Sequence, residues 1–255
     1  MTPRIPTGFP TLDRHLRGGL RREDLVVIGG DAGIGTSALA LGLALAAAES
    51  GVRTAVISTE GRAERLADRA LGQLAAADPA ELDGTELPDA RRVEIATAAA
   101  RLRALPLTMH AATMALADEL HEIAGPDWEV LVIDALEGLV LETSARAEAE
   151  AAWITRLKRA AVARGGTVIL TTHLTGELSR RDDPRPLLRD FGADGAIAAQ
   201  ADLVLGIHRE EHYRPDRGVV GAAELLIVKD RGGPTGAIDC WFEAACRRFE
   251  DLASA

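Results

Sequence analysis

The feature that most constrains the fold is an apolar strand that runs into a glycine-rich turn and then into a long alanine/leucine helix. After the strand Leu25–Ile28, Gly30 and Gly35 are separated by four residues, which is the spacing of a phosphate-binding loop. The pattern then asks for lysine followed by serine or threonine, but this chain has Thr36 and Ser37. The glycines still let several backbone N–H groups converge on an anion at the amino end of the helix. The sequence therefore predicts a phosphate-binding loop without its lysine.

The hydroxyl of Ser37 stands where such loops ligate Mg²⁺. The residues expected to surround a bound nucleotide are Gly30, Asp31, Ala32, Gly33, Ile34, Gly35, Thr36 and Ser37. The alternative interpretation is an ordinary glycine-rich turn between a strand and a helix. The rest of the chain has to decide between the two.

Composition narrows the class of protein. With 255 residues and 47% hydrophobic content, the chain can bury a substantial core as one large domain or two small ones. The apolar run Ala38–Ala48 is far shorter than the roughly 20 residues of a membrane span, so we expect a soluble, cytoplasmic protein. A net charge of −10 argues against coating nucleic acid by general electrostatics. Cys240 and Cys246 are expected to be free thiols.

Strands and helices alternate along most of the chain, which predicts an α/β fold with right-handed parallel crossovers. The expected parallel strands are Leu25–Ile28, Thr54–Thr59, Pro106–His110, Trp128–Leu136 and Thr167–His173. The expected helices are Pro10–Leu16, Ser37–Glu49, Arg62–Ala77, Ala90–Leu105, Ala115–Ala124, Ala147–Arg164 and Ala193–Gln200, with a polar loop at Asp78–Asp89. Strands near Asp202–His208, Ala222–Lys229 and Gly236–Phe242 have no long helices between them and are expected to be antiparallel. No composition shift marks a boundary, so we expect a single domain over residues 1–255.

Two acidic residues end neighbouring strands of the expected sheet. Glu60 follows Thr54–Thr59, and Asp134 follows four buried aliphatic residues. Open α/β sheets bind ligands at the carboxyl ends of their strands. Together with the phosphate loop, this pattern resembles a nucleoside triphosphatase of the RecA type, in which Asp134 would hold the Mg²⁺ shell and Glu60 would polarise the attacking water. Alternatively, Glu60 is a solvated carboxylate that opens a helix.

A series of short motifs makes the chain similar to one family, the ATPase domain of DnaB-type replicative DNA helicases. They run in family order over nearly the whole chain, and the block Lys-x-Arg-x-Gly-Pro-Thr-Gly is the most specific. Besides the phosphate loop, the matching stretches are Pro6–Asp13, Gly18–Leu20, Ser58–Arg62 with Arg69, Leu131–Glu137, Arg185–Asp190, Gly195–Ile197, Ala201–Val204, Tyr213–Asp216 and Lys229–Gly236.

The resemblance implies an enzyme that binds ATP and Mg²⁺, assembles as a ring and couples hydrolysis to movement on single-stranded DNA in replication or a related process. It implies that Glu60 is the catalytic glutamate and Asp134 the Mg²⁺ aspartate. Lys229 and Arg231 would be the basic pair that reaches the γ-phosphate held by the neighbouring subunit. Two residues apart on a strand, they project to one face and can act on one anion. Either further copies of this chain or a complete helicase would form the rest of the ring.

The chain also departs from the family pattern. Thr36 replaces the lysine, and His173 stands where the family has a glutamine that senses the γ-phosphate. In this chain the first loop that lines the family's DNA channel has one basic residue, Arg146, and four acidic residues: Glu137, Glu142, Glu148 and Glu150. The second keeps the candidate DNA-binding residues Arg180, Arg181 and Arg185, together with Arg189, but offsets them with Glu177, Asp182, Asp183 and Asp190. We also expect no amino-terminal primase-binding domain. A second hypothesis is therefore a nucleotide-binding regulatory or partner subunit that lacks helicase activity.

Overall fold

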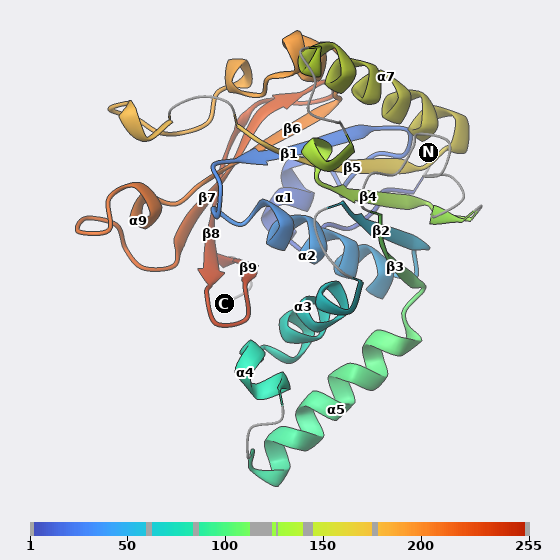
Figure 1. The fold of residues 1–255 in the computed structure, drawn as a ribbon, viewed down its shortest axis with the longest axis vertical. Helices are drawn as coiled ribbons and strands as arrows, with labels where there is room; N and C mark the ends of the chain where they lie inside the picture. The colour runs from blue at the N-terminus through green and yellow to red at the C-terminus, as the bar shows by residue number, and fades with distance from the viewer. Residues whose placement is uncertain are drawn as a thin grey trace.

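One mixed β-sheet runs through the protein (Figure 1). The computed structural model describes residues 3–59, 63–83, 87–112, 124–125, 127–139, 145–174 and 178–252. In these residues the sheet has nine strands in the order β3-β2-β4-β5-β1-β6-β7-β8-β9. In chain order they are β1 (Leu25–Gly30), β2 (Thr54–Ser58), β3 (Leu107–Ala111), β4 (Val130–Asp134), β5 (Thr167–His173), β6 (Leu203–His208), β7 (Ala222–Asp230), β8 (Gly236–Glu243) and β9 (Arg248–Asp251).

The strands from β3 to β6 in that order are parallel, and the alternating sequence pattern predicts this for all of them except β6. Strands β1 and β4 are buried along their whole length, which suits their unbroken aliphatic runs. The pairing register sets Gly30 opposite His173 and Ser58 opposite Asp134. The carboxyl ends of four strands therefore meet at one edge of the sheet, where a ligand is expected.

Strands β7, β8 and β9 are antiparallel to their neighbours, which confirms the prediction for Ala222–Lys229 and Gly236–Phe242. The same prediction for Asp202–His208 was wrong in part, because β6 pairs parallel with β1 and antiparallel only with β7. Strand β9 is not among the strands expected from the sequence. It is only four residues long, and its Phe249 ring packs against Phe242 of β8 with ring centroids 4.7 Å apart. Cys240 and Cys246 are buried free thiols, as expected.

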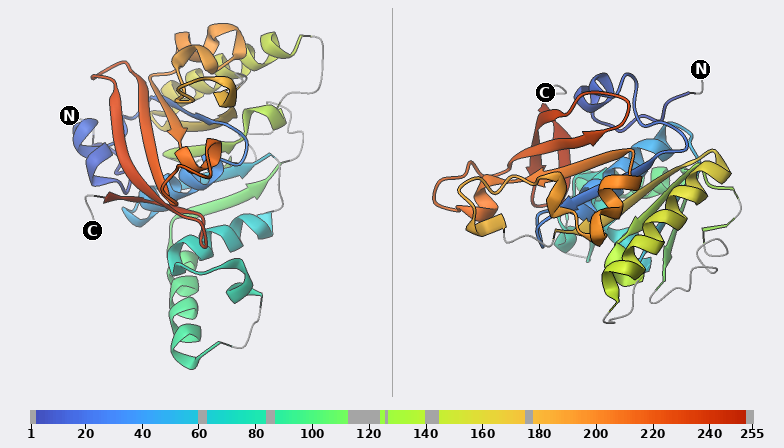
Figure 2. Two further views of the ribbon diagram at one scale, coloured as in Figure 1. Left: turned by 90° about the vertical axis from the view of Figure 1, so that its left-hand side faces the viewer. Right: turned by 90° about the horizontal axis from the view of Figure 1, so that it is seen from above.

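Helices cover both faces of the sheet (Figures 1 and 2). One face carries α1 (Pro10–His15) and α2 (Thr36–Glu49), and α3 (Ala63–Ala75) packs on α2. The other face carries α7 (Arg146–Arg164) and α8 (Ala196–Gln200). Many small alanines in α2 allow the helix to be buried on most sides between the sheet and α3.

The helices α4 (Pro79–Leu82) and α5 (Asp89–Ala104) extend away from the sheet beside α3 (Figure 2). The prediction of a polar loop over Asp78–Asp89 was wrong in part, because Asp78 and Glu81 form a capping box that starts α4. The expected helix Ala115–Ala124 falls almost entirely outside the described residues. None of the helices that the structure describes is both long and apolar enough to cross a membrane.

Candidate nucleotide-binding site

The glycine-rich loop turns sharply from β1 into α2 at the carboxyl edge of the sheet. Gly35, the residue before α2, has φ 116°, and a Cβ there would lie 2.8 Å from the Phe249 ring. Only glycine fits this conformation in this space. Among the described residues, no side chain caps the amino terminus of α2. The first N–H groups of the helix therefore remain available for an anion, as predicted for a phosphate-binding loop.

Three oxygen-bearing side chains meet directly beside this loop. Ser37 Oγ donates a hydrogen bond of 2.9 Å to Asp134 Oδ1, and Thr171 Oγ1 donates to the same oxygen at 2.6 Å. Asp134 is 9% exposed. A serine hydroxyl and a carboxylate are the oxygen ligands that Mg²⁺ accepts beside phosphates, so these residues fit the ion. Thr171 holds the carboxylate in place, and no sequence motif identified it.

The chain after β2 is fastened to the same place. Thr59 N–H donates to Asp134 O at 2.7 Å, and the Thr59 hydroxyl both accepts from Ala135 N–H and donates to Ala135 O, each at 2.8 Å. Glu60, the expected catalytic glutamate, follows Thr59 directly but lies outside the described residues. Thr59, the residue directly before Glu60, therefore contacts the segment that carries Asp134.

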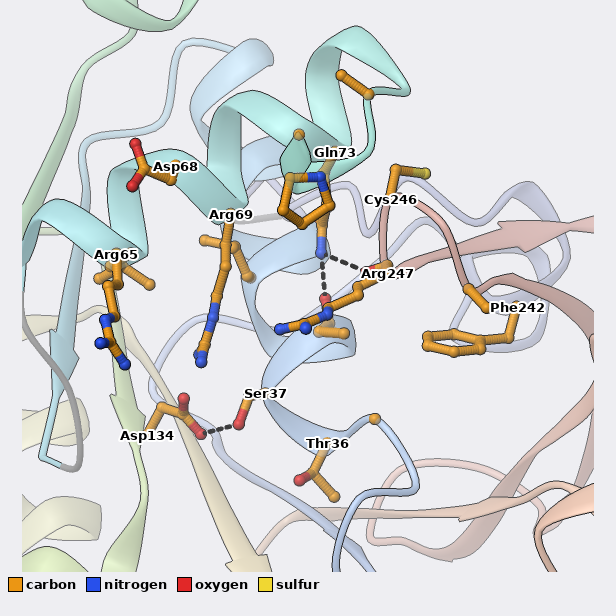
Figure 3. Close-up of a pocket in the computed structure, with 18 of the residues that line it drawn as sticks. Thr36, Ser37, Arg65, Asp68, Arg69, Gln73, Asp134, Phe242, Cys246 and Arg247 are labelled. Carbon is orange, nitrogen blue, oxygen red and sulfur yellow. Dashed lines mark hydrogen bonds between the residues drawn. The ribbon is translucent and has the colours of Figure 1, made fainter. Parts of the chain in front are cut away.

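A cavity of about 700 Å³ opens over the loop (Figure 3). Its floor includes Thr36, Ser37 and Asp134, and its other walls come from α3, α4 and the turn between β8 and β9. The basic residues on these walls are Arg65, Arg69 and Arg247. Arg65 and Arg69 are four residues apart and share one face of α3. Arg69 belongs to one of the matching motifs, but none of these arginines was expected in the site, because they lie on elements remote from the loop in the chain.

His173 borders the same cavity at the end of β5. Its side chain is exposed, and its backbone N–H donates to Glu137 Oε1 at 2.7 Å. The Thr172 hydroxyl donates to the same oxygen at 2.8 Å. Glu137 therefore fixes the main chain that carries His173 and links it to the segment after Asp134.

Lys229 and Arg231 lie at the other edge of the sheet, where the parallel strands begin. Lys229 Nζ donates to the backbone oxygens of Ala198 and Ala201 at 2.6 and 2.5 Å, at the carboxyl end of α8. Arg231 Nη2 donates to Ala199 O at 2.8 Å, and its Nη1 lies 3.2 Å from Asp202 Oδ1.

The pairing of strands separates this basic pair from the chain's own loop. Asp202 N–H donates to Leu25 O, and Arg231 N–H donates to Asp202 O. Leu25 lies five residues before Gly30 on β1. At about 3.3 Å per residue, that is roughly 17 Å along the strands. The two side chains do share one face, as predicted. Strand β7 lies between β6 and β8, so Lys229 does not belong to an edge strand.

The candidate DNA-binding arginines are held by acidic neighbours. Arg181 makes a two-pronged ion pair with buried Asp190, with one contact of 2.7 Å. Arg185 Nε donates to Glu224 Oε2 at 2.8 Å, and its Nη1 lies 3.1 Å from Asp183 Oδ1. Arg180 is exposed in the 3-10 helix η2 (Leu178–Arg180).

Comparison with known proteins agrees with this architecture. The model of the family described as DnaB-like helicase C terminal domain matches residues 4–251. The Replicative DNA helicase DnaB of Helicobacter pylori is 27% identical in an alignment that covers 97% of this chain and 60% of the relative. The protein of the same name from Leifsonia xyli subsp. xyli is 28% identical in an alignment that covers 98% of this chain and 56% of the relative. The chain thus spans a little over half of these relatives.

Solved structures show the same fold. The structure titled "The Structure Of A DnaB-Like Replicative Helicase And Its Interactions With Primase" superposes with a TM-score of 0.88 at 20% identity, covering 97% of this chain and 62% of the other. The crystal structure of the RadB recombinase superposes with a TM-score of 0.59 at 17% identity, covering 97% and 99%. With the family model matching nearly the whole chain, the protein belongs to the DnaB-like helicase C-terminal domain family.

Proposed function

We propose that this protein binds ATP and Mg²⁺ at the Gly30–Ser37 loop and hydrolyses ATP to drive movement on single-stranded DNA, in replication or a related process in the cytoplasm. The observation that carries the proposal is the 2.9 Å hydrogen bond between Ser37 and Asp134 beside an uncapped helix terminus and a cavity of about 700 Å³. Main-chain N–H groups, two metal-ligand oxygens and space for a nucleotide coincide there.

Each residue has a distinct task in this proposal. The backbone of the loop binds the phosphates, while Ser37 and Asp134 hold Mg²⁺, which neutralises phosphate charge when it is bound. Glu60 orients the attacking water and accepts its proton. His173, at the cavity rim, senses whether the terminal phosphate is present. The resemblance to the family supports these tasks, because Glu60 stands where the family has its catalytic glutamate and His173 stands where it has the glutamine that senses the γ-phosphate.

Coupling to DNA requires an oligomer in this proposal. Lys229 and Arg231 lie at the opposite edge of the sheet from their own loop, so they reach a nucleotide only across a subunit boundary. The ring consists of copies of this chain or of this chain and a complete helicase. Arg180, Arg181 and Arg185 contribute to the surface that faces single-stranded DNA.

A second candidate function is a nucleotide-binding regulatory or partner subunit without helicase activity. The ion pairs of Arg181 with Asp190 and of Arg185 with Glu224 favour it, because each arginine already has an acidic partner. DNA phosphates would have to compete with these carboxylates. The replacement of the loop lysine by Thr36 points the same way, since residue 36 then offers no cation to the β- and γ-phosphates.

ATP turnover measured with and without single-stranded DNA separates the two candidates. An enzyme driven along DNA hydrolyses ATP and is stimulated by the strand, and Glu60→Gln abolishes both rates. A regulatory subunit binds ATP in a titration but shows no turnover above that of Glu60→Gln under either condition. If no ATP binds at millimolar concentration, both candidate functions are wrong.

A further inference from the structure

The loop lacks its own cation, but the walls of the cavity over it carry three arginines, Arg65, Arg69 and Arg247. We propose that Arg247, in the turn between β8 and β9, binds the β- and γ-phosphates of the nucleotide held by the same subunit and so replaces the missing loop lysine. This inference rests on the proposed binding of ATP at the Gly30–Ser37 loop, and it adds a binding residue to that site.

A buried glutamine fastens Arg247 next to the phosphate loop. Gln73 Nε2 donates to Arg247 O at 2.9 Å and to Ala38 O at 3.0 Å. Ala38 follows Ser37 in the first turn of α2, and Gln73 is only 3% exposed. One amide therefore holds the main chain of Arg247 against the start of α2. These two hydrogen bonds fix the position of the turn relative to the phosphate loop.

The conformation of the turn separates Arg247 from its neighbour. Arg247 has φ 52°, a conformation that L-residues rarely adopt. Arg248 begins β9 and is used within the fold, since its Nη1 donates to Gln73 O at 2.9 Å and its Nε donates to Glu250 Oε1 at 2.9 Å. In the described part of the chain no hydrogen bond or ion pair holds the Arg247 guanidinium. It is an exposed cation on the cavity wall.

The three cavity arginines approach the floor from two sides (Figure 3). Arg65 and Arg69 project from α3 toward Asp134. Arg247 comes from the β8–β9 side, and its guanidinium lies over the first turn of α2, above Thr36 and Ser37 in this view. A cation that replaces the side chain of residue 36 has to act at this end of α2. A guanidinium also suits phosphate, because it offers several N–H donors in a fixed plane.

Loss of a charge-assisted hydrogen bond lowers affinity roughly ten- to hundred-fold. We therefore expect Arg247→Ala to bind ATP and ADP that much more weakly. Binding of AMP, which lacks the β- and γ-phosphates, should stay unchanged. Arg247→Lys should retain most of the ATP affinity, whereas Arg247→Gln, which keeps a long polar side chain without charge, should not.

The experiment is calorimetric titration of the full chain with ATP, ADP and AMP in the presence of Mg²⁺. Arg17→Ala is the matched control, because Arg17 is also an exposed arginine with positive φ, at 59°, and lies outside the cavity. Thermal unfolding of each variant shows whether it is folded. Should Arg247→Ala fail to fold, the comparison of Arg247→Lys with Arg247→Gln decides alone.

Thr36→Lys provides an independent arm. If Arg247 replaces the loop lysine, Thr36→Lys should tighten ATP binding more in Arg247→Ala than in the wild type, so that the two changes are non-additive. The inference is overturned if Arg247→Ala binds ATP as tightly as Arg17→Ala does, or if only Arg69→Ala weakens binding. In either case the wild type still binds ATP and the proposed function stands. If the wild type binds no ATP, it is the proposed function that has failed.

Discussion

Ser37 and Asp134 are 97 positions apart in the sequence, yet Ser37 Oγ lies 2.9 Å from Asp134 Oδ1. The contact joins the first turn of α2 to the end of β4, and Thr171 on β5 completes it from the neighbouring strand. Two oxygens suited to a hard divalent cation therefore meet at the helix terminus where phosphate is expected. The arrangement is held by the sheet itself, because β4 and β5 are paired and buried.

Ser37→Ala should remove the magnesium dependence of ATP binding. In the wild type we expect chelation of Mg²⁺ to weaken ATP binding roughly ten-fold or more, since the ion neutralises charge between phosphate and carboxylate. In the variant the affinities with Mg²⁺ and with chelator should converge. Ser50→Ala, at the other end of α2, is the control and should behave as the wild type. Retention of a full magnesium effect in Ser37→Ala would show that the hydroxyl is not a ligand.

Thr36→Lys should tighten ATP binding. Thr36 is 7% exposed at the start of α2, so the long lysine stem has to follow the cavity floor before its ammonium reaches the phosphates. A charge-assisted hydrogen bond contributes on the order of 1.5–3 kcal/mol, which corresponds to a ten- to hundred-fold gain. Calorimetry of ATP against wild type and variant measures it. Thr36→Met, which has a long side chain without charge, should give no gain, and an equal gain from both would argue against a charge effect.

Much of the fold was predictable because its elements obey local rules. Unbroken aliphatic runs such as Val130–Asp134 fit strands buried on both faces, and the glycine-rich turn after β1 needs the backbone freedom of Gly35. The short elements were not predictable in the same way. Strand β9 has only four residues, and it is held by the Phe249–Phe242 contact, which depends on tertiary packing.

Site residues at the ends of strands and in the glycine-rich loop were predictable from the sequence. Site residues that are brought in by tertiary packing were not. Asp134 and Ser37 were expected to converge, and they do. Thr171 and Gln73 were missed, since a threonine in a buried strand and a glutamine in a helix carry no signal until their partners are known. Their roles come from partners far along the chain, Asp134 in one case and Arg247 in the other.

Asp24→Asn should stabilise the protein above about pH 6. Burial and the nearby Asp202 carboxylate raise the pKa of Asp24 from 3.8 to about 6. The Asp230 carboxylate also raises this pKa, whereas the positive charges of Arg21 and Lys158 lower it. The folded state therefore binds the proton more tightly than the unfolded chain. The resulting stabilisation is present below about pH 4 and is lost as pH rises through 6.

Thermal or urea unfolding between pH 4 and 8 measures the effect. Two pKa units correspond to at most about 2.7 kcal/mol, and solvent screening of a partly exposed side chain reduces this to on the order of 1–2 kcal/mol. The gain of Asp24→Asn over wild type should grow between pH 4 and 7 and then level off. Asp239→Asn, at an exposed position on β8, should show no such growth. A gain that did not vary with pH would mean that ionisation of Asp24 is not its cause.

Changing Lys229 and Arg231 together to Ala should have two separable effects. The first is a loss of stability, because the Ala198 and Ala201 oxygens lose the ammonium that donates to them, which costs on the order of 1–3 kcal/mol. Burial lowers the pKa of Lys229, and the neighbouring charge of Arg231 adds to this. Unfolding by urea measures this first effect.

The second effect is on catalysis across a subunit boundary. Basic groups supplied in trans are worth 10³–10⁵ in rate in other phosphoryl-transfer enzymes, so we expect turnover per folded subunit to fall by roughly ten-fold or more. Turnover should be measured for the protein alone and mixed with a helicase from the same cell. Lys158→Met is the matched control, since Lys158 Nζ pairs with Asp202 at 2.6 Å at the same edge of the sheet. It should lower stability without lowering the rate. If the double variant keeps both rates, or if the protein is strictly monomeric with ATP, then Lys229 and Arg231 serve only to hold the end of α8.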